Sequence, residues 1–136
     1  MNFQKRMIIN KTLLDSVSKQ AKESPRLRMN YNLHEKLTDS THRFFNAMEP
    51  GTVVPIHRHQ NCAETFILVR GSMRVVLYDD DRNVIEDTIL SAGGDNYGIH
   101  IPTGVWHWVD ILESGTITFE VKEGPYEPLK EEDIMK

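Results

Sequence analysis

Short strand-forming segments separated by turn signals fill most of the chain after residue 40, and this pattern limits the fold more than any other feature. The segments are rich in Val, Ile, Phe, Thr and Trp, which favour extended backbone. Turn-forming pairs such as Pro50-Gly51, Gly71-Ser72 and Gly93-Gly94 lie between them. Many short strands with regular turns are typical of a β-sandwich or a barrel. The predicted strands are 43–48, 53–58, 65–70, 73–78, 84–90, 98–101, 106–112 and 116–122.

The chain before the strands has a different pattern. Apolar residues recur at helical spacing in residues 10–23, with charged residues between them, and this predicts one amphipathic helix. These apolar residues are Leu13, Leu14, Val17 and Ala21. Asn10 or Thr12 is expected to cap the start of the helix, and Ser24-Pro25 to end it. Residues 26–40 are polar and irregular, and no regular structure is predicted there.

Composition and charge exclude several classes of protein. The chain has 136 residues, which fits one domain, and a net charge of −4 without a Lys/Arg cluster. Binding to nucleic acid or to a membrane surface is therefore not expected. The one cysteine, Cys62, excludes an intrachain disulfide and agrees with a reducing compartment. Because no apolar run has the length of a signal peptide or a membrane span, we expect a cytoplasmic protein.

Two histidines and a glutamate are closely spaced in the first half of the predicted strand region. Side chains alternate faces along a strand, so His57 and His59 are expected to point the same way, together with Val53 and Pro55. A short turn at about residue 60–63 would place Glu64 beside them at the start of the next strand. Two imidazoles and a carboxylate on one inner face suit a divalent ion of intermediate softness.

A third histidine follows a tight turn far downstream. The Pro102-Thr103-Gly104 turn leads into His107 at the start of the predicted strand 106–112, which makes His107 a fourth candidate ligand. Since imidazole dominates this set, Fe, Mn, Ni, Co or Zn is favoured over Mg or Ca. Cys62 lies between the candidate ligands and is either a further ligand, a redox-active thiol or a small turn residue.

The two segments resemble the two sequence motifs of the cupin superfamily. The first has the full spacing Gly, five residues, His-x-His, four residues, Glu, six residues, Gly, and the second has the core Pro-x-Gly-x-x-His. Asn96 stands where the full second motif has Gly, and Ile111 where an Asn often follows. The resemblance implies an all-β, double-stranded β-helix (a cupin jelly-roll barrel) that binds one divalent transition metal ion in its mouth. The implied metal ligands are His57, His59, Glu64 and His107.

A narrower resemblance covers nearly the whole chain. Residues 24–34 (SPRLRMNYNLH), 43–51 (RFFNAMEPG) and 120–126 (EVKEGPY) are similar to the WbuC-type cupin-fold metalloproteins. That group is associated with bacterial surface-polysaccharide (O-antigen) gene clusters. The resemblance divides the single structural domain into an N-terminal helix and polar arm, 1–40, packed on a cupin domain, 41–136.

The polar arm and the last predicted strand supply candidate substrate-binding residues. In one interpretation the arm folds over the barrel mouth and its arginines bind an anionic group, such as a sugar-nucleotide phosphate. In the other, the arm is a solvated loop whose side chains make turn hydrogen bonds. The arm residues concerned are Arg26, Arg28, Asn30, Asn32 and His34. The family resemblance adds Glu120, Lys122 and Tyr126 to the pocket.

Two functional hypotheses follow. The first is a metal-dependent enzyme acting on a sugar or sugar nucleotide, with isomerisation, epimerisation and oxygenation all open. The second is a non-catalytic module that binds metal and sugar, or that senses metal. A small-molecule, carbohydrate-derived ligand is expected for the enzyme and for the sugar-binding module. A homodimer is expected as well, because the edges of a sheet and the Trp106/Trp108 pair need cover.

Overall fold

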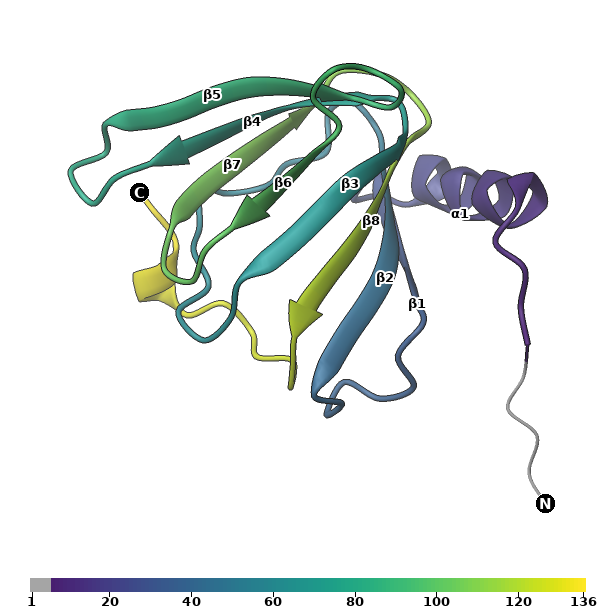
Figure 1. The fold of residues 1–136 in the computed structure, drawn as a ribbon, viewed down its shortest axis with the longest axis horizontal. Helices are drawn as coiled ribbons and strands as arrows, with labels where there is room; N and C mark the ends of the chain where they lie inside the picture. Colours follow the sequence, from purple (N-terminus) through teal and green to yellow (C-terminus); the bar gives the residue numbers. More distant parts are fainter. Residues whose placement is uncertain (1–5) are drawn as a thin grey trace.

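Two antiparallel β-sheets and one helix make up the computed structural model, which describes residues 6–136 (Figure 1). The larger sheet has the strand order β1-β2-β8-β3-β6, and the smaller has the order β5-β4-β7. Residues 1–5, the start of the predicted N-terminal region 1–40, lie outside the described part. The strands are β1 Arg28–Asn32, β2 Thr41–Met48, β3 Glu64–Arg70, β4 Ser72–Tyr78, β5 Val84–Ser91, β6 Gly98–Ile101, β7 Trp106–Ile111 and β8 Thr116–Glu123.

The predicted N-terminal helix is confirmed as α1, Lys11–Glu23. Asn10 is its N-cap: the side-chain Oδ1 accepts a hydrogen bond from the backbone N–H of Leu13 at 3.0 Å. The helix ends at Ser24, whose extended backbone suits the residue before a proline. No helix among residues 6–136 is both long and apolar enough to cross a membrane.

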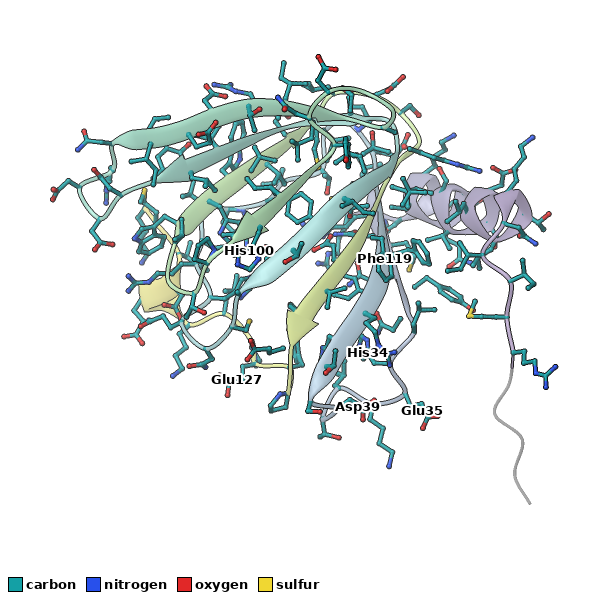
Figure 2. All side chains as sticks on the ribbon, in the orientation of Figure 1. His34, Glu35, Asp39, His100, Phe119 and Glu127 are labelled. Carbon is teal, nitrogen blue, oxygen red and sulfur yellow. The ribbon has the colours of Figure 1, made fainter. Side chains whose placement is uncertain are left out.

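Side chains of β2 and β8 alternate between two apolar environments. Those on the outer face, including Phe45 and Ile117, pack against the buried stripe of α1, and Figure 2 shows Phe119 on the side of β8 toward the helix. Those on the inner face, such as Met48, point between the two sheets. There they join a second cluster formed by Phe66, Leu68, Met73, Val75, Leu90, Ile101 and Ile111. The period-two pattern thus separates a helix-covered core from the interior of the barrel.

The strand prediction is wrong for residues 53–58, although the other predicted strands are present. This segment is extended but unpaired except at His57, which forms isolated bridges to His107 and Ile134. Pro55 has no N–H to donate to a neighbouring strand. Without continuous pairing the expected common face is lost, and Val53 points to solvent with 81% of its surface exposed.

The prediction of irregular structure at 26–40 is wrong for residues 28–32, which form β1. This strand pairs with β2 in the register Arg28↔Met48 to Asn32↔Phe44 and so extends the edge of the larger sheet. Met29 and Tyr31 alternate with Arg28, Asn30 and Asn32, but the strand is short and mostly exposed, which makes its pattern weaker than that of the other strands. The C-terminal tail contains one 3-10 turn, η1 Glu131–Asp133.

The glycine that ends the first motif has a steric role in this fold. Gly71 turns the chain between β3 and β4 at φ +78°, and a Cβ there would lie 2.2 Å from Oγ1 of Thr116. Gly93 has a similar φ of +74°, but a Cβ there would meet no atom within 4 Å. Substitution of Gly93 therefore measures the free-energy cost of a Cβ at positive φ alone, without the clash with Thr116.

We expect Gly71→Ala to lower the free energy of unfolding by about 3 kcal/mol, because left-handed backbone strain and overpacking add together. Gly93→Ala should lower it by only about 1 kcal/mol, the backbone cost alone. Urea unfolding of both variants measures the difference. Equal losses would show that the close approach to Thr116 is unimportant.

Candidate metal centre

Backbone hydrogen bonds join the two motif segments at their histidines. The N–H of His57 donates to the carbonyl of His107 at 3.0 Å, and the N–H of His107 donates back at 2.8 Å. The carbonyl of His59 accepts from the N–H of Gly104 at 2.7 Å, so the Pro-x-Gly turn is attached to the same segment. The loop between β2 and β3 is thereby held against the start of β7.

The side chains of the three histidines cluster together. Their candidate ligand nitrogens all lie within 4.8 Å of one another. Glu64, the first residue of β3, places Oε1 at 3.1 Å from Nε2 of His107 and Oε2 at 3.7 Å from Nε2 of His59. Three imidazoles thus lie together, with one carboxylate against two of them.

Hydrogen bonds to the backbone fix the tautomer of two of these histidines. Nδ1 of His57 lies 2.8 Å from the carbonyl of Pro55, and Nδ1 of His107 lies 2.9 Å from the carbonyl of Val105. A carbonyl only accepts, so each Nδ1 carries the proton, and in the neutral ring each Nε2 presents a lone pair. Such a bond to the far nitrogen is the usual way in which a protein orients a metal-binding imidazole.

The residues present fit a metal ion. Nε2 of His107 is fully buried and lacks a hydrogen bond of good geometry, although Oε1 of Glu64 is only 3.1 Å away. A lone pair facing a carboxylate at that distance in a buried place is repulsive unless a cation lies between them. Either a proton or a metal ion meets this requirement, and the donor set of three imidazoles and one carboxylate is that of a transition metal site.

Burial and mutual charge shift the pKa of all four groups. Burial alone would lower the pKa of His107, but its contact with Glu64 and the charge of Glu64 outweigh this and raise it. Burial, together with the charge of His107, lowers the pKa of His57 to about 4, so this ring stays neutral. Burial also lowers the pKa of His59, against the opposing effect of Glu64. Burial alone would raise the pKa of Glu64, but the histidines and Lys122 outweigh it and hold the pKa below its usual range. Glu64 is therefore ionised, as a metal ligand must be.

A cavity of about 530 Å³ adjoins this cluster inside the barrel. The four candidate ligands form one end of its wall. Its apolar wall includes Met29, Phe44, Met48, Val54, Phe66, Met73, Val109 and Leu129. Its polar lining includes Arg26, Arg28, Asn30, Asn46, Glu120, Lys122 and Tyr126. A largely apolar cavity with a few polar groups has the general form of a small-molecule site.

Glu120 is a buried carboxyl in this cavity that is not part of the ligand cluster. Its Oε2 accepts from Nδ2 of Asn46 at 3.0 Å and from Oγ1 of Thr118 at 2.8 Å. Burial and the charge of Glu64 raise its pKa to about 7. Glu64 and Glu120 thus differ: Glu64 is ionised, whereas Glu120 exchanges its proton near neutral pH.

Asn46 was missed by the sequence analysis. It lies on β2 between Phe44 and Met48 at the inward positions of an apolar strand, and its Oδ1 is buried without a hydrogen-bond partner. A polar residue at an inward position of such a strand is the signal that could have identified it.

The other predicted site residues fall into two groups. Arg26, Arg28, Lys122 and Tyr126 line the cavity, whereas Asn32 is exposed at the end of β1 and does not. Cys62 lies outside the cavity lining and the histidine cluster, and burial raises the pKa of its thiol.

His34 is buried away from the cavity. Its Nδ1 lies 3.2 Å from both the N–H and the carbonyl of Arg43, and its ring stacks on His42 with 4.0 Å between centroids. Figure 2 shows it near Asp39, at the end of β1 and β2. Its contacts with Arg43 and His42 hold the connection between β1 and β2 in place.

Comparison with known proteins gives one family match. The model of the family described as "Domain of unknown function (DUF6016)" matches residues 9–90, more than half of the chain. The chain belongs to this family. No curated protein matches it.

Solved structures show what the fold is. KdgF from Halomonas sp. superposes with a TM-score of 0.59 at 19% identity, over 76% of this chain and 83% of its own. BH2720 from Bacillus halodurans gives 0.60 at 16% identity, over 92% and 86%. Oxalate decarboxylase OxdC from Bacillus subtilis gives 0.55 at 19% identity, over 74% of this chain but only 30% of its own length. These similarities confirm the expected cupin jelly roll, and at these identities they carry the fold alone.

The raised pKa of Glu120 predicts a specific pH dependence of stability in metal-free protein. In the unfolded chain Glu120 loses its proton near pH 4.5, whereas in the folded protein it keeps the proton up to about pH 7. Between these two pH values the unfolded state therefore binds fewer protons, and the free energy of unfolding falls as pH rises. Glu120→Gln removes the effect. Between pH 5 and pH 8 the variant should gain about 2–3 kcal/mol in unfolding free energy relative to the unsubstituted protein. Urea unfolding of chelator-treated protein at both pH values tests this, and a difference that does not change with pH contradicts it.

Proposed function

We propose that this protein is a metal-dependent enzyme of the WbuC type, acting on an anionic, hydroxylated small molecule of the sugar or sugar-nucleotide class in surface-polysaccharide (O-antigen) biosynthesis. The single observation that carries the proposal is the cluster of His57, His59 and His107 in the wall of the cavity, with Glu64 against two of them. The sugar class rests on the sequence resemblance described above. Isomerisation, epimerisation and oxygenation stay open as reaction types.

The metal ligands in this proposal are His57, His59, Glu64 and His107. Their chemistry favours Fe, Mn, Ni, Co or Zn. These residues would hold a divalent ion, which would supply Lewis-acid chemistry to the site. The two backbone-bonded histidines, His57 and His107, are already in the tautomer that a metal requires.

Three cations along the cavity wall support an anionic substrate. Lys122 lies opposite Glu64 in the β3–β8 register, and neither it nor Arg26 or Arg28 has an ion-pair partner within 4.0 Å among the described residues. Nη1 of Arg28 donates to the carbonyl of Val53 at 3.0 Å, which directs this half-buried guanidinium along the cavity rim. Cations without protein partners at a cavity can bind a carboxylate or phosphate through charge-assisted hydrogen bonds.

Glu120 favours an enzyme over a binding module. A carboxyl whose pKa lies near neutral pH can both give and take a proton, which is the property of a general acid or base. Asn46 and Thr118 hold one of its oxygens from inside the barrel wall. In the proposed reaction Glu120 exchanges a proton with the substrate while Lys122 holds the anionic group.

The homodimer expected from the sequence stays a prediction.

We expect His57→Ala and His107→Ala to abolish stoichiometric metal binding without unfolding the barrel, because each removes a ligand at one end of the cavity. Elemental analysis of purified protein, with circular dichroism as the measure of folding, tests this. His100→Ala is the matched control, because His100 is exposed on β6 and bonds only to Thr65, at 2.7 Å. Wild-type metal content in both ligand variants would refute the proposed site.

Lys122→Met should weaken the binding of inorganic phosphate and nucleotide sugars by about tenfold, since one charge-assisted contact is lost. A titration monitored by melting temperature measures this, because a bound ligand stabilises the folded state by mass action. Lys19→Met, at an exposed position of α1, controls for net charge. An identical loss in both variants would mean that Lys122 does not touch the ligand.

A further inference from the structure

The outer sides of the ligand-bearing segments form a second, separate cluster. Arg58 lies between His57 and His59, Trp106 directly precedes His107, and neither residue lines the cavity. The two side chains meet: the guanidinium carbon of Arg58 is 4.4 Å from the centroid of the Trp106 ring. A cation over the face of an indole is an attractive contact. Each ligand segment is thus attached to the other on its outer side as well.

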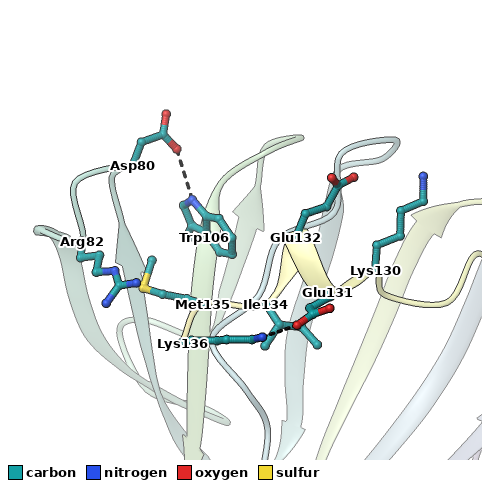
Figure 3. Close-up of a pocket in the computed structure, with 9 residues that line it drawn as sticks. All are labelled: Asp80, Arg82, Trp106, Lys130, Glu131, Glu132, Ile134, Met135 and Lys136. Atoms are coloured by element: carbon teal, nitrogen blue, oxygen red, sulfur yellow. Dashed lines mark hydrogen bonds and ion pairs between the residues drawn. The ribbon is translucent and has the colours of Figure 1, made fainter.

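Two carboxylates hold this pair. Oδ1 of Asp133 accepts a hydrogen bond from Nε of Arg58 at 3.3 Å and another from Nε2 of Gln60. Oδ1 of Asp80 accepts from Nε1 of Trp106 at 3.2 Å, a contact that Figure 3 shows beside the C-terminal residues. The Asp133 side chain is 11% exposed and that of Asp80 is 87% exposed. Because solvent screens exposed pairs, Asp133 is the stronger of the two contacts.

The backbone of the C-terminal residues reinforces the same contact. The N–H of Arg58 donates to the carbonyl of Asp133 at 3.1 Å, and the N–H of Met135 donates to the carbonyl of Ile56 at 2.8 Å. His57 is therefore bridged by His107 on one side and by Ile134 on the other. Since residues 53–58 belong to no sheet strand, these contacts fix the conformation of the segment.

We propose that Arg58, Trp106 and Asp133 form a positioning clamp that holds the histidine segments at the spacing a metal ion needs, so that metal affinity depends on C-terminal residues 133–135. The inference rests on the proposed metal function. None of the three residues lines the cavity. The clamp acts by ordering the ligands in advance, so that less order has to be imposed when the metal binds.

The chain contains a matched control for this arrangement. Arg74 on β4 lies 6.0 Å from the ring of Trp108 on β7 and pairs with Asp87 at 2.7 Å. This is the same combination of arginine, tryptophan and aspartate on the outside of the smaller sheet. Trp108 follows His107 on β7, but the contacts of Arg74 are with Trp108 and Asp87 and do not join the His57–His59 segment to the C-terminal residues. Replacing Arg74 therefore reproduces the loss of a surface arginine over a tryptophan without removing a contact of the His57–His59 segment.

The test measures Co²⁺ binding to metal-free, full-length protein by competition with a chelating indicator. Arg58→Met keeps the aliphatic stem and removes the charge, and it should weaken Co²⁺ binding tenfold or more, as loss of a supporting partner does at other metal sites. Asp133→Asn, which preserves shape, should weaken it several-fold. Arg58→Lys keeps a charge over Trp106 and should recover part of the affinity. Arg74→Met should stay within twofold of wild type.

A second readout separates positioning from general stability. The visible absorption bands of bound Co²⁺ report the geometry of its ligands and should shift in Arg58→Met but not in Arg74→Met, even where both variants melt at the same temperature. Asp133→Asn carries the test if Arg58→Met does not fold.

The outcomes distinguish the two proposals. If wild-type protein binds no Co²⁺, the proposed metal function is wrong, and so is the proposed role of the clamp. If wild-type protein binds Co²⁺, and Arg58→Met and Asp133→Asn match it in affinity and spectrum, the clamp alone is overturned.

Discussion

Side-chain alternation along β2, β3 and β8 determines most of what the cavity contains. Glu64 lies opposite Lys122 in the β3–β8 register, and Glu120 lies two residues further along β8 on the same face. A shift of β8 by one residue would turn Glu120 and Lys122 toward helix α1 and bring Phe119 and Val121 into the cavity. The strand register therefore controls the charge pattern of the site as well as the packing of the core.

The cavity keeps two neighbouring carboxyls in different protonation states by giving them different partners. Glu64 faces imidazoles, which favour its charge, and Glu120 receives hydrogen bonds only from an amide and a hydroxyl. Burial penalises both charges, but His107 and His59 outweigh it at Glu64, whereas at Glu120 the charge of Glu64 adds to it and the effect of Lys122 is too small to compensate. Because the pKa values of Glu64 and Glu120 differ in this way, one site can provide both a fixed anion and a proton donor at neutral pH.

Local patterns in the sequence predicted the helix, most strands and the histidine cluster, because periodicity and motif spacing are local properties. They failed where pairing between distant residues decides the structure. β1 is short and mostly exposed and exists as a strand because β2 offers it a partner, whereas residues 53–58 look like a strand but form only isolated bridges, at His57. The closing contact of that segment comes from Asp133 to Met135, which no local pattern connects to the motif. The role of Asn46 likewise depends on Glu120, on another strand.

The bonds that orient His57 and His107 come from the carbonyl groups two residues earlier in the same chain segments, at Pro55 and Val105. Each histidine therefore carries its orienting group with it, and no side chain from the cavity wall takes part. Residues of that wall can change without altering which nitrogen of His57 and His107 bonds to the backbone and which is left free. The small molecule that such a cavity accepts is therefore free to diverge during evolution while the histidine cluster keeps its arrangement.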